Sequence, residues 1–428
     1  MTADPSRREV VIVGAGPAGM LLAWLLATRG VAVHVIERHA DFQREFRGEG
    51  IQASVVRHLE ELGLLDELLA SGAAIPARSA TIFLDNRVVA ELAGVGDQAD
   101  FGIILHQERF LSFLHERLLR LPNYRATFGT TVRGFIRDGD RIVESVASGE
   151  RGEVRIGGSL FVVATGRGTS LRKAAGLEAR TVDTHFNILW LRLPAPTDAS
   201  LVPSGFRAYL TGDSLFIVHP TDGGNIQMAW SRRDEMVLKD SDHARKKARL
   251  LGEAPPPYRA FLDEHYRPTT RTQFLRVQCD RLSHWSAPGV LFVGDAAHTM
   301  SPVAGQGINL AMRDSIVVAR HLLARVEQGQ SWDDDAIGAA IQAEREPEIR
   351  AMQTFQRRLG YFMLGAPRWQ VRAFFGAALP LLTKLGIRRR LLRRVQAGVV
   401  KLQIDDVASI ASRSAMRALP PGFERAPS

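Results

Sequence analysis

Apolar residues near the start of the chain fall into short runs on either side of a helix-length segment. The β-branched run from Glu9 to Ile12 and the run from Val31 to Ile36 have the composition of buried strands, and Met20 to Thr28 between them has helical spacing. A similar run from Val290 to Val293 appears much later in the chain. Strands that alternate with helices in this way are typical of a parallel α/β sheet.

The middle of the chain alternates apolar and polar residues with the period of a strand. Residues 181–279 contain the runs THFNILWLRL, FRAYLT, SLFIVHP and NIQMAWS, separated by turn clusters such as PAPTD, TGDS and TDGGN. This spacing predicts an antiparallel sheet. We expect residues 79–91 to add an edge to the same sheet.

Beyond Arg345, apolar stripes alternate with arginines at helical spacing, which predicts helices. The longest apolar run, Ala373 to Thr383, is too short to cross a bilayer. We expect these helices to pack on the preceding domain and close a pocket. The alternative is a basic amphipathic surface for acidic membranes. The five arginines from Arg388 to Arg394 support this alternative.

Composition changes this picture little. The chain has 428 residues, of which 45% are hydrophobic, enough for two or three domains with substantial cores. A single cysteine, Cys279, rules out an internal disulfide framework and fits a reducing compartment. The charged start MTADPSRRE does not resemble a signal peptide, so we expect a cytoplasmic protein.

The net charge of +9 belongs to the end of the chain. Residues from Arg345 to Ser428 carry 16 basic and 5 acidic side chains, whereas the 39 basic and 41 acidic residues before them nearly cancel. A nucleic-acid-binding protein would show a broad basic surface instead. The sequence therefore argues against DNA or RNA as a partner.

The first βαβ unit contains a glycine motif with recognisable chemistry. Gly14 allows a tight turn, Gly16 lets a pyrophosphate approach the backbone at a helix N-terminus, and Gly19 lets helix and strand pack closely. Glu37 ends the second strand, where an acid accepts hydrogen bonds from an adenosine ribose. Strand, helix, second strand and terminal acid are in register, so we predict dinucleotide binding rather than a simple turn.

A second segment, GDAAHTMSPVAGQGINLAM, indicates which dinucleotide is bound. Asp295 follows the strand from Val290 to Val293, at the edge where parallel sheets present ligand groups. Residues 302–307 can bring bare backbone against a flat ring, and a helix from about Ile308 points its positive end at the same place. A cofactor that uses only the first motif would not need this segment, whereas FAD satisfies both.

GAGPAG and GDAAHTMSPVAGQGINLAMRDS, in this order, resemble the motifs of flavin monooxygenases of the p-hydroxybenzoate hydroxylase type (group A), over about residues 8 to 345. The resemblance implies that Glu37 binds the adenosine ribose, Asp295 the ribityl chain and residues 302–309 the isoalloxazine. It also places Arg47 beside the pyrophosphate.

By the same resemblance, Gln107 contacts the ribityl or the pyrophosphate. A surface arginine and a helix-capping glutamine remain the alternatives for Arg47 and Gln107. The full set of expected cofactor-binding residues is Gly14, Gly16, Ala18, Gly19, Glu37, Arg38, Arg47, Gln107, Asp295, Pro302, Gly305, Gly307, Ile308 and Asn309.

The resemblance also implies an α/β fold, with a Rossmann-like FAD-binding domain of the GR2 type, an inserted antiparallel β-sheet substrate domain and a C-terminal helical region. The expected division is residues 1–78, 101–180 and 280–345 for the three parts of the FAD-binding domain, 79–100 for edge strands of the substrate domain, 181–279 for its sheet, and 346–428 for the basic helical region.

One motif departs from the family pattern. In VVATGRGTSLRK, Gly166, Ser170 and Arg172 fit, but Thr165 stands where the family has an aspartate. A threonine can form one hydrogen bond but supplies no charge and no two-oxygen acceptor. The change either weakens nicotinamide contact or is neutral.

Side chains of the middle segment are candidates for lining a substrate pocket under the flavin, although core packing is favoured for any single one. They are Trp190, Phe206, Tyr209, Phe216, His219, Met228 and Trp230. His219 is also a candidate acid or base. Neither His219 nor Pro302, the other candidate for a catalytic role, is assigned one.

The reactivity is expected to come from the cofactor. The sequence contains no Cys/His metal cluster, Gly-x-Ser-x-Gly elbow or P-loop, so no metal is predicted. Within the family signature, His298 is expected to fix the loop rather than move protons. A nicotinamide donor must dock transiently at the flavin, because no second glycine motif follows a strand.

The interpretation is therefore an FAD-dependent monooxygenase. NADPH or NADH reduces FAD, O2 adds at the C4a carbon, and the hydroperoxide hydroxylates or epoxidises an electron-rich aromatic or polyene-like small molecule, of the kind found in secondary metabolism. The alternatives are an FAD-dependent isoprenoid double-bond reductase and a flavin-binding protein without turnover. A flavin halogenase is disfavoured because WxWxIP is absent.

Overall fold

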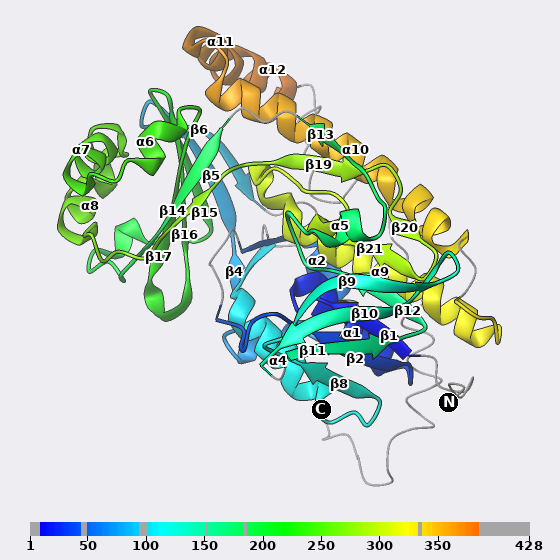
Figure 1. Ribbon diagram of the computed structural model, residues 1–428. Helices are drawn as coiled ribbons and strands as arrows, with labels where there is room; N and C mark the ends of the chain where they lie inside the picture. Colours follow the sequence, from blue (N-terminus) through cyan, green and yellow to red (C-terminus); the bar gives the residue numbers. More distant parts are fainter. Residues whose placement is uncertain are drawn as a thin grey trace, which may run out of the picture.

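The computed structural model describes residues 9–43, 49–93, 102–150, 152–182, 186–332 and 336–384. These residues form two parts, each built on a large sheet, with a long helix running along both (Figure 1). Within the described ranges, no helix is long and apolar enough to cross a membrane.

A six-stranded sheet forms the centre of the first part. Its order is β20-β21-β12-β1-β2-β8, and all neighbours run parallel except the edge pair β20 and β21. Continuous apolar runs suit a parallel sheet because both of its faces are covered. The strands are β1 (Glu9–Val13), β2 (Ala32–Ile36), β8 (Tyr124–Thr127), β12 (Leu160–Val163), β20 (Ser286–Ala287) and β21 (Val290–Phe292).

Helices cover one face of this sheet. α1 (Pro17–Ala27) contacts both α4 (Gln107–Leu118) and α9 (Gln306–Glu327), and is therefore buried on almost every side. The βαβ unit predicted from the sequence is confirmed. α1 begins at Pro17, earlier than Met20, because proline suits the first turn of a helix, where its missing N–H removes no intrahelical hydrogen bond.

A three-stranded antiparallel sheet packs against the same six-stranded sheet, and the sequence analysis did not identify it. It consists of β9 (Thr131–Asp138), β10 (Arg141–Gly149) and β11 (Gly152–Gly157). Phe135 of β9 meets Phe161 of β12 edge-on, with ring centroids 5.8 Å apart. The turn clusters DGD and GERG between alternating runs were the available signal.

Short elements complete the first part. A small sheet has the order β3-β7-β4, and β13 pairs with β19. The bounds are β3 (Gly50–Gln52), β4 (Ala74–Ala77), β7 (Gly102–Leu105), β13 (Ala179–Val182), β19 (Cys279–Leu282), α2 (Ala53–Glu61), α3 (Leu65–Ala70) and α5 (Leu171–Ala174).

The second part is a seven-stranded sheet of order β18-β14-β17-β16-β15-β5-β6. Its pairs are antiparallel, as the sequence predicts, except that β5 runs parallel to β15, because these neighbours come from distant segments and not from a hairpin. The strands are β5 (Ser79–Leu84), β6 (Arg87–Ala93), β14 (Asn187–Leu193), β15 (Phe206–Thr211), β16 (Ser214–Pro220), β17 (Ile226–Arg232) and β18 (Thr272–Leu275).

One face of this sheet is covered by α6 (Glu235–Lys239), α7 (His243–Glu253) and α8 (Arg259–His265), seen at the left of Figure 1. Alternate strand residues such as Leu191, Phe216 and Trp230 pack there against Tyr258 and Leu262. The opposite face is left for the remainder of the molecule.

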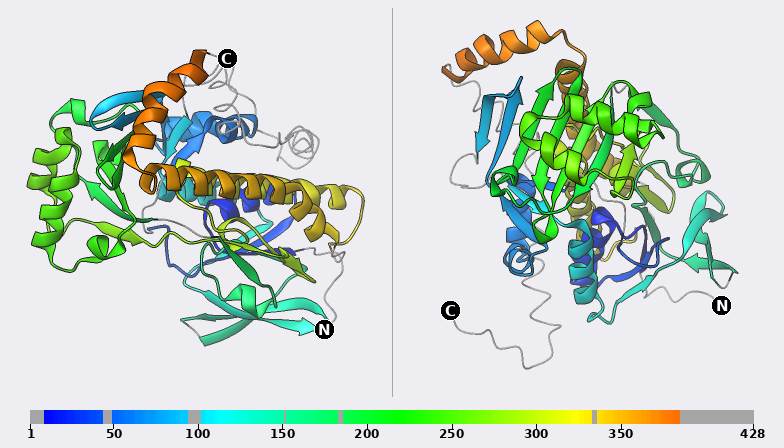
Figure 2. Two further views of the ribbon diagram at one scale, coloured as in Figure 1. Left: turned by 90° about the horizontal axis from the view of Figure 1, so that it is seen from above. Right: turned by 90° about the vertical axis from the view of Figure 1, so that its left-hand side faces the viewer.

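The long helix α10 (Ala336–Leu364) lies along both parts, because it contacts α9 and β20 in the first and β16 in the second (Figures 1 and 2). It is followed by α11 (Arg368–Ala373), a π-helical turn (Phe374–Ala378) that lies against β6, and α12 (Leu379–Lys384). The boundary expected between residues 345 and 346 falls inside α10.

Candidate active site

A cavity of about 1110 Å³ lies between the two parts. One end is lined by backbone-rich segments: the glycine turn after β1, the end of β2, the turn at Asp295 and the loop 302–307. The other end is lined by apolar side chains of the seven-stranded sheet, of α10 and of the segments that follow α10. The two ends thus differ sharply in chemistry.

The glycine turn is built by close backbone contacts. Gly14 has a φ of 107°, and a Cβ atom there would lie 2.6 Å from the carbonyl oxygen of Ala164. Gly19 packs on the same turn, since its Cβ would lie 2.0 Å from the Gly14 oxygen. Gly14, Gly16 and Ala18 line the cavity, whereas Gly19 stands behind them.

The N-terminus of α1 faces this end of the cavity. Among the described residues, no side chain caps it, so the first N–H groups of the helix are available to a ligand. Unpaired N–H groups and the helix dipole together favour an anion at this point. Gly16, as the N-cap residue, presents backbone alone.

Glu37 lies at the end of β2 with its side chain 4% exposed. Its Oε2 accepts a hydrogen bond of 2.7 Å from the Ala15 N–H, and its Oε1 accepts one of 3.1 Å from the His39 N–H. Arg38, the next residue along the chain, also lines the cavity. Arg47 lies outside the described residues.

Asp295 lies in a 3-10 turn (Gly294–Ala296) after β21 and lines the cavity. Its Oδ2 is 3.8 Å from the Arg167 Nε. Arg172 holds the turn from behind, donating to the carbonyl oxygens of Asp295 at 3.0 Å and Ala296 at 2.7 Å. Arg172 also forms a two-pronged ion pair with Asp280, at 2.8 and 3.0 Å.

The pKa of Asp280 is held below its ordinary value. Burial alone would raise it, but the Arg172 guanidinium and hydrogen bonds from Thr299 outweigh that effect. The carboxylate therefore stays charged, and the ion pair that positions the turn persists over the physiological pH range.

The loop 302–307 brings backbone to the cavity. Ala304 and Gly305 both adopt left-handed conformations, with φ of 59° and 61°, which is uncommon for an alanine. Pro302, Gly305, Gly307 and Ile308 line the cavity. α9 begins at Gln306 and not at Ile308, and among the described residues no side chain caps its N-terminus either.

Asn309 is not among the residues that line the cavity, and its expected contact with the cofactor stays a prediction. Its side chain donates to the carbonyl oxygens of Gly50 at 3.0 Å and Gly305 at 2.8 Å, and accepts from the Gln52 N–H at 2.8 Å. All of these partners are backbone groups of β3 and of the loop. Asn309 therefore holds the loop against β3.

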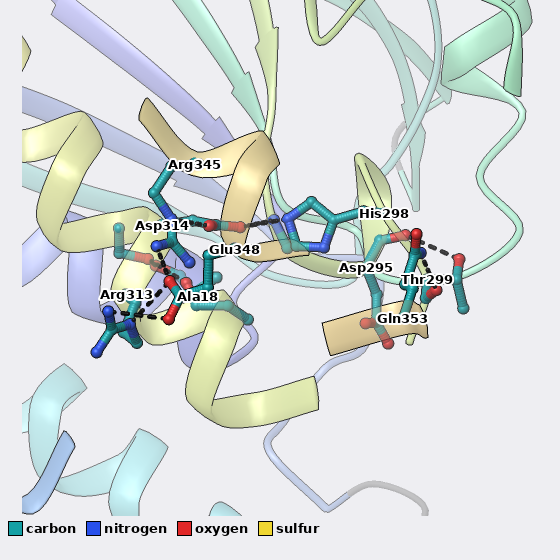
Figure 3. A network of polar contacts seen from close by, with 12 residues as sticks. Ala18, Asp295, His298, Thr299, Arg313, Asp314, Arg345, Glu348 and Gln353 are labelled. Atoms are coloured by element: carbon teal, nitrogen blue, oxygen red, sulfur yellow. Dashed lines mark hydrogen bonds and ion pairs between the residues drawn. The ribbon is translucent and has the colours of Figure 1, made fainter. Parts of the chain in front are cut away.

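A buried carboxylate, Asp314 of α9, fixes the turn from the other side (Figure 3). It accepts hydrogen bonds from the Gly294 N–H at 2.9 Å, His298 Nε2 at 2.7 Å and Arg345 Nε at 2.7 Å. Burial would raise the pKa of Asp314, but His298 and Arg345 reverse that effect and lower it to about 2. His298 thus has the loop-fixing position expected of it.

Residues of α10 hold the loop along its length, and sequence reasoning missed them. Gln353 donates to the carbonyl oxygens of Asp280 at 2.9 Å and Thr299 at 3.1 Å. Gln356 donates to those of Ser301 at 2.7 Å and Val303 at 2.8 Å. Polar residues at helical spacing on a face that also carries Ile349 and Met352 were the available signal.

Gln107 and Thr165 also line the cavity. Gln107 is the first residue of α4. The hydroxyl of Thr165 is buried, and within the described part of the chain it has no hydrogen-bond partner. A buried hydroxyl without a partner is unfavourable, so a ligand at this position would complete its hydrogen bonding.

The structure separates the expected substrate-pocket residues into two groups. Trp190, Phe206 and His219 line the cavity. Tyr209, Phe216, Met228 and Trp230 belong to the core under the helices α6 to α8, so placing these four in the pocket was wrong. Successive strand residues point to opposite faces, and cross-strand partners such as Phe216 and Trp230 share the outer face.

The comparison with protein families agrees with this geometry. A model of the FAD binding domain family matches residues 7–356. The chain belongs to this family. It is similar to the 6-methylpretetramide 4-monooxygenase of Streptomyces rimosus, with 27% identity over 414 residues that cover 94% of this chain and 95% of the relative.

Solved structures share the fold. The p-nitrophenol 4-monooxygenase of Pseudomonas putida matches with a TM-score of 0.76 and 19% identity, covering 91% of this chain and 99% of that one. The Diels-Alderase PyrE3 matches with a TM-score of 0.70 and 22% identity, covering 91% and 80%. Proteins named for different activities therefore share this fold, and these likenesses establish the fold alone.

This member of the FAD-binding family is an FAD-dependent monooxygenase of the p-hydroxybenzoate hydroxylase type, as the sequence predicts. FAD is its cofactor, and NAD(P)H is the electron donor typical of the family. Small molecules are the substrates of such enzymes. Among the described residues, no group of three or more His, Cys, Asp or Glu side chains could hold a metal ion.

We predict that Gly19→Ala disrupts the glycine turn, because the new methyl group would overlap the Gly14 carbonyl oxygen. The expected loss of unfolding free energy is about 1–3 kcal/mol, as for other overpacked sites. FAD should also dissociate at least tenfold more readily. Urea unfolding and the flavin content after gel filtration measure the two effects.

The matched control is Gly252→Ala in α7, where a methyl group meets no atom within 4 Å. It should be neutral or stabilise the protein by roughly 0.5–1 kcal/mol, as expected for glycine-to-alanine changes in helices. Equal losses of FAD in both variants would contradict the role given to Gly19.

We predict that Arg345→Met destabilises the protein by about 3–5 kcal/mol, because it leaves Asp314 buried without its arginine partner and removes one of the two arginines that pair with Glu348. The turn at Asp295 should loosen in the same variant, which lowers FAD retention. Arg320→Met breaks a partly exposed pair with Glu344 and should lower the free energy of unfolding by no more than about 1 kcal/mol. Similar chemical denaturation midpoints for the two variants would refute this ranking.

Proposed function

We propose that FAD occupies the glycine-lined end of the cavity and that an electron-rich, largely apolar substrate occupies the other end. The proposed FAD contacts are the glycine turn and Glu37 for the adenosine half, and Asp295 with the loop 302–307 for the flavin half. The observation that carries this proposal is that two uncapped helix N-termini, those of α1 and α9, face one cavity.

The residues present fit this cofactor. The glycine turn leaves room at the N-terminus of α1, where a pyrophosphate carries its charge, and the buried Thr165 hydroxyl lacks a partner within the described chain. When bound, FAD supplies the redox chemistry, taking electrons from NAD(P)H and passing them to O2. The N-terminus of α9 favours negative charge at the loop, which supports the reduced form of a flavin.

The substrate end calls for an apolar ligand. The cavity is lined there by Ile82, Ile217 and Leu275 of the sheet and by Phe355 and Leu359 of α10. Such walls position a flat hydrophobic molecule and keep water from the reacting atoms, which protects a reactive oxygen species from loss to solvent. An aromatic or polyene-like substrate of secondary metabolism fits these walls, and the Streptomyces rimosus relative is named a 6-methylpretetramide 4-monooxygenase.

The other parts of the proposal follow from this division. The first part of the fold serves the cofactor and the seven-stranded sheet serves the substrate, with O2 as co-substrate. A cytoplasmic location stays a prediction. Peripheral membrane contact through the basic C-terminal helices also stays a proposal, and the arginine-rich stretch 388–394 lies outside the described residues.

The test of this function starts with purified protein. We expect it to be yellow, to retain FAD, and to oxidise NADPH or NADH faster when a suitable mono-, bi- or tetracyclic phenol is added, with matching O2 uptake. A comparison of NADPH with NADH identifies the preferred donor. Failure to take up O2 under every condition would exclude the monooxygenase, and failure of the flavin to be reduced would leave only a binding role.

We predict that Ile217→Gln raises the KM of a stimulating phenol about tenfold, because a polar side chain replaces part of the apolar wall. FAD content and NAD(P)H oxidation without phenol should not change, since Ile217 lies on the sheet side of the cavity. Ile217→Val, which keeps the wall apolar, serves as the control. An unchanged KM in the glutamine variant would argue against a substrate site on this face.

A further inference from the structure

A small group of polar side chains interrupts the apolar substrate end of the cavity. Trp190 of β14 and His219 of β16 line it, with ring centroids 6.2 Å apart and planes inclined by 72°. Both residues are almost fully buried, at 5% and 1% exposure. Within the described chain, Trp190 Nε1 and His219 Nε2 have no hydrogen-bond partner.

These two nitrogen atoms have opposite hydrogen-bonding roles. The indole Nε1 only donates. His219 Nδ1 lies 2.9 Å from the carbonyl oxygen of Pro220, so Nδ1 carries the proton and Nε2 offers a lone pair. Buried polar groups are seldom left unsatisfied, and a donor beside an acceptor matches the two hydrogen-bonding functions of a hydroxyl group.

The surroundings of His219 favour a neutral ring. Burial lowers its pKa below the ordinary value, and the negative charge of Glu49 and the Pro220 carbonyl oppose this only in part, while His106 adds to the lowering. Glu49, just before β3, and His106, just before α4, are the titratable groups that act on it. Phe206, Trp190 and Gln227, from the neighbouring strands β15, β14 and β17, carry no charge.

His219 is also linked to the loop 302–307 through neighbouring residues. Its ring centroid is 5.3 Å from that of Phe206, and the Phe206 ring rests on Gly50, where a Cβ would lie 2.8 Å from it. The Gly50 carbonyl accepts from Asn309, which also holds Gly305. The group therefore lies at the end of the substrate space that faces the loop.

We infer that Trp190 and His219 bind a phenolic hydroxyl of the substrate and that His219 Nε2 removes its proton. The O–H bond breaks with its electron pair left on oxygen, and an N–H bond forms at Nε2. This is a proton transfer, so no atom changes oxidation state. Glu49 balances the positive charge on the ring, and the Trp190 N–H donates to the new phenolate. Ionisation makes the aromatic ring more electron-rich, which is what an electrophilic oxygen donor requires.

This inference rests on the proposed substrate site, and 4-nitro-1-naphthol tests it without turnover. This bicyclic phenol is strongly coloured when ionised. Bound to the FAD-loaded protein, it should ionise at a pH at least one unit lower than in solution, a tenfold shift in the ionisation equilibrium. The methyl ether of the same compound, which cannot ionise, displaces it and so measures site occupancy.

In His219→Gln the bound naphthol should ionise at or above the pH at which it ionises in solution. Trp190→Phe should lose part of the downward shift, and the shift in Glu49→Gln should lie between those of the other two variants. Glu49→Asp, which keeps the charge, should restore most of the wild-type value. His115→Gln, in α4 and away from the cavity, should behave like the wild type. A purely structural role for His219 would alter occupancy and not the ionisation of the bound naphthol.

If the bound naphthol ionises at the same pH as in solution in the wild type, or if His219→Gln shows the wild-type shift, the inference is overturned. FAD retention and O2 uptake are measured on the same samples. Loss of either in the wild-type protein would count against the proposed function, while a normal flavin with an unshifted naphthol counts against this inference alone.

Discussion

The buried carboxylate of Asp314 is the constraint on which the site depends. It joins the turn after β21, the helix α9 and the helix α10, through the Gly294 N–H, His298 and Arg345 (Figure 3). A charge in such a dry place is tolerated only when it is fully paired, and here each partner comes from a segment that carries part of the site. The turn at Asp295 is therefore set before any ligand arrives, which is the condition for precise positioning.

The helix α10 extends this constraint to the substrate. Gln353 and Gln356 of this helix donate to backbone carbonyl oxygens of the segment that leads into the loop 302–307, and Arg345 pairs with Asp314. Phe355 and Leu359 of the same helix line the cavity. Because these residues belong to one helix, the distance between the loop 302–307 and the apolar wall is fixed by helix geometry. The sequence predicted C-terminal helices that pack on the preceding domain and close a pocket, and α10 contacts α9 and lines the cavity.

What the sequence could predict was the chemistry that is local in the chain. The glycine turn at Gly14 and the turn at Asp295 are readable because backbone conformation and ligand contact are set within a few residues. The residues that hold the turn at Asp295 lie far away in sequence, such as Arg345, which acts through Asp314. No local sequence pattern identifies them. The confusion of Trp190 with Trp230 had another origin: composition marks both as aromatic, whereas only the strand period, counted through each run, assigns them to opposite faces.

The two-residue period of a strand also determines how polarity changes along the cavity. On β16 the residues that face it are Leu215, Ile217 and His219, so the strand changes from apolar to polar within three alternate positions. Leu215 packs with the apolar cluster of α11 and the π-helical turn, while His219 lies beside Phe206, which rests on Gly50 next to the loop 302–307. A substrate with one polar edge would therefore enter in a single orientation, with that edge toward the loop. Since proteins named for other activities share this fold, such a gradient on one strand is where this chain can set its own specificity.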